Sequence, residues 1–237
     1  GQSGFECGRN APEATVTLLL QREQAHITRT ACFRGYVDLS CFFMSICRDV
    51  QHVVERRAGV RVEVTDVTFA LQAATLMRYD TGAGLTEGLL SERGVGQGTV
   101  DGPRRSTLLL AQMQRAVDLL CAGFFHSANC RAEGLRVPCV FFADDGGFST
   151  DSFPMLQLVF DVISTVARAQ GLTISVKPDG SKTAWTGMEY DPWRQVWHEC
   201  DDGRYVELVG GARVPRVSAY KHLGTVMGTT MSHELLR

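Results

Sequence analysis

Apolar residues recur along the chain with two different periods, which predict helices and strands in alternation. A period near 3.6 predicts helices over residues 10–26, 43–57, 105–123 and 152–171. Short apolar or alternating runs predict strands over residues 32–39, 137–142, 172–176, 183–188, 205–209 and 220–227. Because the later strands are joined by short polar turns, we expect antiparallel pairing and an α+β fold class.

The stretches between these elements are less regular. Residues 60–68 alternate between apolar and polar side chains, with valines along one side, and this pattern predicts a further strand. Residues 69–79 have helical spacing, and residues 82–102 are rich in glycine. The chain has no internal repeat and no low-complexity linker, so we expect one continuous domain over residues 1–237.

Composition and charge narrow the function classes. Apolar residues make up 44% of the 237 residues, so a sizeable core can form. The formal net charge of −2 argues against a tight, autonomous nucleic-acid binder, although it is compatible with a local basic groove. The eight cysteines include no CxxC pair, which predicts free thiols in a reducing, intracellular compartment. No apolar run reaches the ~20 residues of a membrane helix, so we expect no membrane partner.

Three aspartates are the candidate metal-binding and catalytic residues. Asp38 ends a predicted strand, and Asp144 and Asp145 lie about a hundred residues later at the tip of a predicted hairpin. Consecutive carboxylates repel each other, so such a turn gains from a counter-cation. Three carboxylates on adjacent strands suit two Mg²⁺ ions, with Mn²⁺ as a substitute, and two ions about 3.5–4 Å apart catalyse phosphoryl transfer. Taken alone, however, Asp-Asp-Gly-Gly is an ordinary turn sequence, and Asp38 can equally be a helix cap.

The motifs around these aspartates resemble those of reverse transcriptases. Six segments carry the resemblance in the family's order: G-F and G-R within 4–9, V-D-L-S-x-x-F at 37–43, G-V-G-Q-G at 94–98, F-A-D-D at 142–145, G-L-x-I followed by K-T within 171–183, and Y-K-H-L-G at 220–224. The resemblance is closest to the non-long-terminal-repeat retrotransposon and group II intron types. It implies a right-hand polymerase palm, an antiparallel sheet with helices packed on one face, plus part of the fingers. The first part of the fingers and the thumb are expected outside this sequence.

The resemblance implies catalytic roles for four residues. Asp38, Asp144 and Asp145 match the metal ligands of the family. Lys182 matches a lysine near the pyrophosphate leaving group, where it would be a general acid. For Lys182 the alternative is an ordinary solvated surface lysine.

The resemblance also implies a nucleotide-binding set. The backbone carbonyl of Leu39 is expected to reach a metal ion. Phe43 matches the residue that stacks under the incoming sugar and excludes a 2′-hydroxyl, and core packing is its alternative. Gln97 and Gly98 match a segment that contacts the incoming nucleotide and the template, and a plain loop is their alternative.

The function implied by the resemblance is RNA-directed DNA polymerisation, which transfers nucleotides to a primer 3′-hydroxyl within a retroelement protein. The expected partners are an RNA template, deoxynucleoside triphosphates and a nucleic-acid primer. Leu223 and Gly224 match the hairpin that grips the primer end, and an ordinary edge strand is their alternative. A degenerate, inactive remnant that binds nucleic acid is one alternative. An RNA-templated RNA polymerase is another, although it commonly has a G-D-D turn. A nuclear location fits such an element, but the sequence shows no targeting signal.

Overall fold

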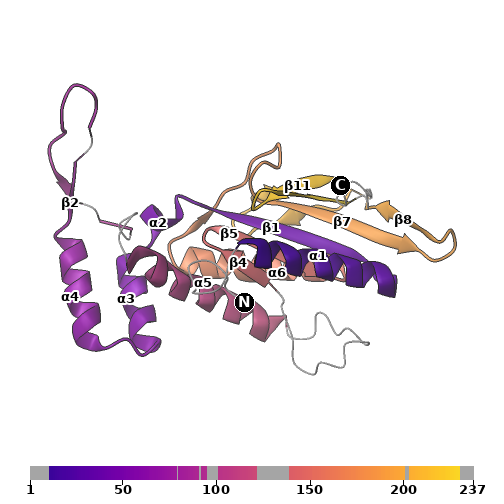
Figure 1. Ribbon diagram of the computed structural model, residues 1–237, viewed down its shortest axis with the longest axis horizontal. Coiled ribbons are helices and arrows are strands. Elements are labelled where there is room, and N and C mark those ends of the chain that lie inside the picture. The colour runs from indigo at the N-terminus through magenta and orange to yellow at the C-terminus, as the bar shows by residue number, and fades with distance from the viewer. Residues whose placement is uncertain are drawn as a thin grey trace.

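An antiparallel sheet forms the centre of the structure, a computed structural model that describes residues 11–78, 80–90, 92–94, 101–121, 139–200 and 203–229 (Figure 1). The order of its strands is β4 (Cys139–Phe142), β5 (Asp145–Thr150), β1 (Cys32–Ser40), β7 (Ala184–Asp191) and β8 (Val196–Glu199), and β6 (Thr173–Ile174) also pairs with β1. Neighbouring strands in this sheet pair in the antiparallel sense. The predicted α+β class and antiparallel pairing are confirmed.

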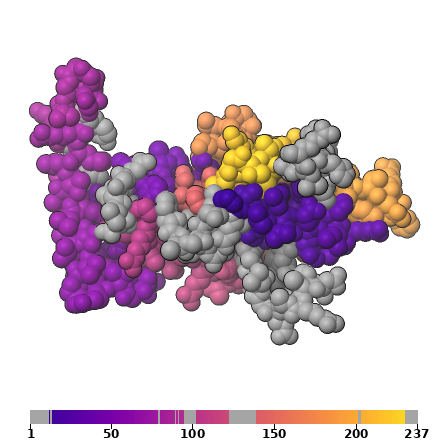
Figure 2. Space-filling view, in the orientation of Figure 1, coloured from indigo at the N-terminus to yellow at the C-terminus, as the bar shows by residue number. Residues whose placement is uncertain are grey.

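Helices and short hairpins complete the structure, some packed on the sheet and others beyond one of its ends (Figure 1). The helices in the described residues are α1 (Ala11–Thr28), α2 (Phe42–Ser45), α3 (Arg48–Arg57), α4 (Val62–Ala73), α5 (Asp101–Leu120) and α6 (Phe153–Ala169). The short hairpins are β2 (Leu76–Met77) with β3 (Leu89–Leu90), β9 (Val206–Glu207) with β10 (Arg213–Val214), and β11 (Ala219–His222) with β12 (Thr225–Gly228). Figures 1 and 2 show α3 and α4 at one end of the molecule and the β7–β8 hairpin at the other. None of the helices described here combines the length and apolar character needed to cross a membrane.

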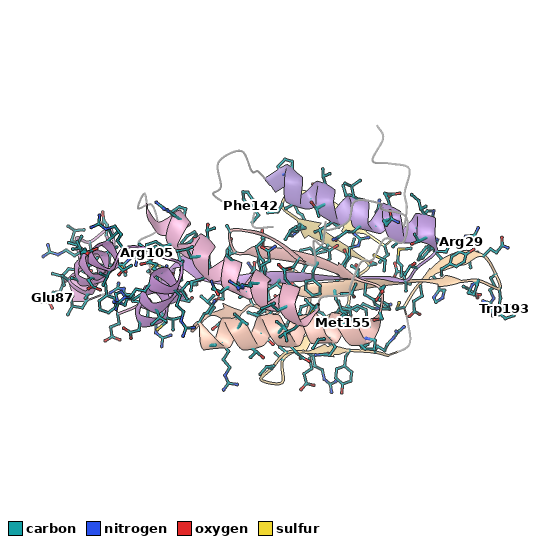
Figure 3. All side chains as sticks on the ribbon, turned by 90° about the horizontal axis from the view of Figure 1, so that it is seen from below. Arg29, Glu87, Arg105, Phe142, Met155 and Trp193 are labelled. Carbon is teal, nitrogen blue, oxygen red and sulfur yellow. The ribbon has the colours of Figure 1, made fainter. Side chains whose placement is uncertain are left out.

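Strand β1 is buried on both faces, and its side chains alternate between two cores. Phe33, Val37 and Leu39 belong to the main core, which they share with α5 and α6. Tyr36 belongs to a second core on the opposite face, together with α1 and the β11–β12 hairpin. Figure 3 shows the sheet between α1 and α6. The predicted layer of helices is therefore formed by α5 and α6, while α1 covers part of the other face.

The predicted strand over residues 60–68 is wrong, because most of these residues form the first part of α4. This helix packs beside α3, where the ring centroids of His52 and Phe69 lie 5.2 Å apart, and Thr65 is fully buried. The alternating Val62 and Val64 are 39% and 53% exposed, so they mark no buried sheet face. A helix satisfies its backbone hydrogen bonds locally, without needing a neighbouring strand.

Two predicted elements are divided in the structure. The helix predicted over residues 43–57 is interrupted at residues 46–47, which separates α2 from α3. The strand predicted over residues 220–227 is a hairpin, because Leu223 and Gly224 have φ angles of 48° and 85° and reverse the chain between β11 and β12. In both cases the spacing of apolar residues continues across the point where the chain changes direction, so the break could not be predicted from that spacing.

Replacing Gly35 with alanine should destabilise the fold. A Cβ atom at this position would lie 2.1 Å from Cζ of Phe148, whose ring packs edge-on against Phe160 of α6 at a centroid distance of 5.0 Å. We expect Gly35→Ala to lower the free energy of unfolding by about 1–3 kcal/mol, the usual cost of overpacking, measured by urea denaturation. The matched variant Gly88→Ala, where the nearest side-chain atom would be 3.4 Å away, should change it by less than about 0.5 kcal/mol. Equal losses in the two variants would contradict this explanation.

Candidate active site

Asp38 and Asp145 are direct cross-strand neighbours. The antiparallel register of β1 and β5 places these two residues opposite each other, so their carboxylates project from the same face of the sheet. Since side chains alternate along a strand, this is the face on which Tyr36 packs, the face covered by α1 and the β11–β12 hairpin. Sheet register therefore brings together two aspartates that are far apart in the sequence.

Asp144 lies in the two-residue turn between β4 and β5. Phe142 pairs with Asp145 across this turn, and Ala143 has a φ angle of 55°, in the left-handed region. Such a conformation costs a non-glycine residue about 1 kcal/mol or more, and strain of this kind is concentrated at functional sites. The carbonyl of Asp144 accepts a hydrogen bond of 3.2 Å from the Leu39 N–H. The turn is thus tied to β1, and all three aspartates lie at one end of the β1–β5 pair.

Asp38 is buried and is held by three neighbours. Its N–H donates a hydrogen bond to Oγ1 of Thr183 at 3.1 Å, and its carbonyl accepts one from the Ser175 N–H at 2.8 Å. Its carboxylate oxygen Oδ1 accepts a hydrogen bond from Nζ of Lys182, also at 2.8 Å. The structure therefore places Lys182 beside the aspartates, with its ammonium compensating the charge of Asp38.

Negative charge accumulates around Asp145. Burial, followed by the nearby Asp144 and Asp38 carboxylates, raises the pKa of Asp145 from 3.8 to about 6, against an opposing effect of Lys182. The hydrogen bond to Asp38 is the main reason that the pKa of Lys182 is raised. A raised carboxyl pKa means that the ionised form is disfavoured, so an additional cation at this site would relieve the repulsion.

The donor set suits a hard divalent cation, although it is not a preformed cage. Carboxylates are the protein ligands that Mg²⁺ takes together with water and substrate phosphates. Within the part of the chain that the structure describes, no three His, Cys, Asp or Glu side chains gather closely enough to hold a metal ion by themselves. Lys182 neutralises Asp38 in this arrangement. The aspartates therefore fit a divalent ion only if further oxygen ligands complete its coordination.

The predicted nucleotide-binding residues have different surroundings. Leu39 is 1% exposed and its side chain lies in the main core, so only its backbone can take part in a site. Phe43 is half-buried against the same core, with its ring centroid 5.3 Å from that of Phe42. Gln97 and Gly98 lie outside the described residues.

The predicted primer-gripping residues form the turn of the β11–β12 hairpin, at Leu223 and Gly224. This hairpin is stacked on β1, because the rings of Tyr36 and Tyr220 are nearly parallel, 4.3 Å apart at their centroids and inclined by 9°. Burial, and then the cross-strand carboxylates of β5 and β1, raises the pKa of Tyr220. The hairpin thus lies within electrostatic reach of the aspartates, a proximity that was not predicted from the sequence.

Arg48 has a positioning role that was not predicted from the sequence. This buried side chain donates hydrogen bonds to the carbonyls of Gln72, Arg93 and Gly94 at 2.7, 3.2 and 3.1 Å. These bonds hold α4 and residues 93–94 of the glycine-rich stretch against the beginning of α3. A single arginine at a helix start gives no signal of such a role in the sequence, because its three acceptors are backbone groups.

Comparisons with known proteins support the fold. No family model and no curated protein matches the chain. Among solved structures, apo telomerase from Candida tropicalis truncated of its C-terminal domain is similar at 13% identity and a TM-score of 0.52, over 95% of this chain and 41% of that one. Telomerase from Candida tropicalis in complex with a TWJ fragment of telomeric RNA is similar at 11% identity and a TM-score of 0.53, over 93% and 33%. The chain spans less than half of either protein, and the similarity concerns the fold that it shares with these telomerase structures.

The raised pKa of Asp145 predicts a pH-dependent contribution to stability. Since its folded-state pKa of about 6 exceeds the ordinary 3.8, the folded chain binds this proton more tightly than the unfolded chain. The contribution is fully present below pH ~4 and is lost as the pH rises through ~6. Urea denaturation across this range should therefore show a fall in the free energy of unfolding that Asp145→Asn removes. Asp151→Asn, at an exposed carboxylate just after β5, should keep the fall, and the same fall in Asp145→Asn would contradict the assignment.

Proposed function

We propose that residues 1–237 are the palm and part of the fingers of an RNA-directed DNA polymerase, which extends a primer 3′-hydroxyl under the direction of an RNA template. The observation that carries the proposal is the register that sets Asp38 opposite Asp145, with Asp144 in the adjoining turn and Lys182 bound to Asp38. The similarity to telomerase structures supports a polymerase of this fold, and one of those structures contains telomeric RNA. The order of motifs along the sequence favours a retroelement protein.

In the proposed reaction the aspartates supply the negative field that holds divalent ions. Asp38 and Asp145 would be the principal ligands, with Asp144 beside them. When bound, two Mg²⁺ ions stabilise the attacking and leaving oxygens of the phosphoryl transfer. Asp38 is held in place without a bound ion, because Thr183 and Ser175 fix its backbone by hydrogen bonds of 3.1 and 2.8 Å.

Lys182 and Phe43 would act on the incoming nucleotide. The side chain of Lys182 is 39% exposed, so the ammonium that binds Asp38 is also open to a triphosphate from the surface. Its raised pKa keeps it protonated, as a donor to the leaving pyrophosphate must be. Phe43 follows Asp38 at the start of the helical segment and would contact the sugar, where a bulky ring disfavours a 2′-hydroxyl.

Primer extension tests the proposed activity. The assay uses a protein that includes this chain, an RNA template, a primer, deoxynucleotides and Mg²⁺. We expect Asp144→Asn with Asp145→Asn to slow extension by about 10³-fold or more, because the lost electrostatic stabilisation is worth several kcal/mol. Asp151→Asn, a control carboxylate outside the site, should extend the primer at the wild-type rate.

Extension that persists in the double variant would overturn the role of the hairpin aspartates. Template binding without any extension by the folded wild-type protein would instead identify an inactive remnant that acts as a nucleic-acid binding module. The two results are separated by fluorescence anisotropy of a labelled template, measured on the same samples.

Divalent-ion binding can be checked without catalysis. Mn²⁺ bound to the chain is measured by electron paramagnetic resonance, in which free Mn²⁺ gives the signal. We expect Asp38→Asn to weaken binding by at least about tenfold. Lys182→Gln should strengthen it, because the ammonium no longer neutralises Asp38. Unchanged affinity in both variants would place the ion elsewhere.

A further inference from the structure

The turn between β7 and β8 presents a tryptophan to solvent. Trp193 is 94% exposed, although a buried aromatic ring typically removes ~150–250 Å² of surface from water. The turn is nevertheless well fixed, because Oδ1 of Asp191 accepts hydrogen bonds from the N–H groups of Trp193 and Arg194 at 2.9 and 3.1 Å. Pro192 restricts the backbone further. The fold therefore holds this ring outward on an ordered turn.

More aromatic rings lie at the base of the same hairpin. Tyr190 and Trp197 face each other across β7 and β8, with ring centroids 5.4 Å apart. His26, near the end of α1, stacks on Trp197 at 5.5 Å with an interplanar angle of 23°. Tyr190 and Trp197 are half-buried, whereas His26 is exposed. We call these three rings, together with Trp193, the hairpin aromatic cluster.

Two arginines accompany the cluster. The guanidinium of Arg29 lies 5.3 Å from the ring centroid of Tyr190, and Figure 3 shows Arg29 and Trp193 at the same end of the molecule. The side chain of Arg194 is 82% exposed, and its nearest carboxylate, Asp191, lies 3.8 Å away. That carboxylate already accepts two backbone hydrogen bonds, which lower its pKa. This end of the molecule therefore carries both aromatic rings and guanidinium groups.

The base of the cluster lies on the face of the sheet that carries the aspartates. Ala184 pairs with Tyr36 on that face, and Tyr190 follows Ala184 at an even spacing along β7, so it projects to the same side. At about 3.3 Å per residue, the β7–β8 turn lies roughly 30 Å from Asp38. Because α1 and the β11–β12 hairpin cover this face between the two places, the cluster is a separate surface at the far end of the sheet.

We propose that the hairpin aromatic cluster binds a single-stranded segment of nucleic acid, with bases stacked on Trp193 and its neighbouring rings and phosphates near Arg29 and Arg194. Exposed rings beside cations bind single strands with little sequence preference, since every base has a stacking face. The side chains that follow the ring in the turn, Arg194 and Gln195, are polar and exposed, which favours a charged strand over an apolar protein surface. This inference rests on the proposed function only for the choice of nucleic acid as the partner.

Oligonucleotide binding tests the inference. The probes are a fluorescein-labelled oligouridine and an oligothymidine of about 15 nucleotides, titrated with the chain by anisotropy. We expect Trp193→Ala to weaken binding about tenfold, within the range for the loss of one stacked base, and Trp193→Phe to keep most of it. Binding should also quench tryptophan fluorescence, and Trp193→Ala should lose most of this quenching. Tighter binding of oligouridine would assign the cluster to RNA, and tighter binding of oligothymidine would assign it to DNA.

Matched variants separate this inference from the proposed polymerase. Tyr205→Ala removes another exposed ring, 52% accessible and covered by Arg213, and should bind both probes like the wild type. Asp144→Asn with Asp145→Asn should abolish extension yet leave probe binding intact. Wild-type binding by Trp193→Ala would overturn the inference. The inference would also be overturned if analytical ultracentrifugation showed that the only effect of Trp193→Ala is to convert a self-associated chain to monomers, because the ring would then contact protein.

Discussion

The pairing register of β1 with β5 is the constraint on which the rest of the structure depends. Side chains alternate along a strand, so a slip of one residue would turn Asp38 into the main core and move Leu39 into the site. The register is specified by tight packing on both faces. On one face Gly35 leaves room for the ring of Phe148, and on the other Gly147 leaves room for Leu18 of α1, whose Cδ1 would lie 2.6 Å from an added Cβ. These glycines are required by close packing and do not loosen the sheet.

That register imposes an electrostatic cost, and the surroundings of the site offset part of it. Two carboxylates directly opposite each other repel. Burial is the main cause of the raised pKa of Asp145, and the carboxylates of Asp144 and then Asp38 add to it. Lys182 compensates Asp38, and backbone hydrogen bonds to Thr183 and from Ser175 keep its position. Among the described residues, no comparable ion pair compensates the charge of Asp145. Lys182 opposes the rise in its pKa but does not cancel it. A fold that needed stability alone would not gather these charges, so the arrangement favours a role in binding cations and phosphates.

The sequence predicted the parts of this fold that depend on local pattern. The regular apolar face of α6 and the short apolar run of β1 both reflect buried side chains, so both elements were predicted. The pattern over residues 60–68 was misassigned, since alternation says nothing about whether a partner strand exists. The motif around Asp144 and Asp145 predicted the candidate site, but no local pattern could show that Asp38 pairs with Asp145. That contact is a property of sheet order.

The low net charge of the chain is compatible with work on nucleic acid if affinity comes from several local sources. Phosphate contacts by lysine and arginine give salt-dependent, non-specific affinity, and a chain with a net charge of −2 has little overall field to provide it. Stacking on Trp193 and its neighbouring rings would depend on aromatic surface, with Arg29 and Arg194 adding only local charge. The two ends of one sheet would then divide the work. Charged residues around Asp38 would bind cations and phosphates, and the rings of the β7–β8 hairpin would bind a strand through its bases. The negative charge of the carboxylates would then not weaken the binding of the strand, because the two sites lie far apart.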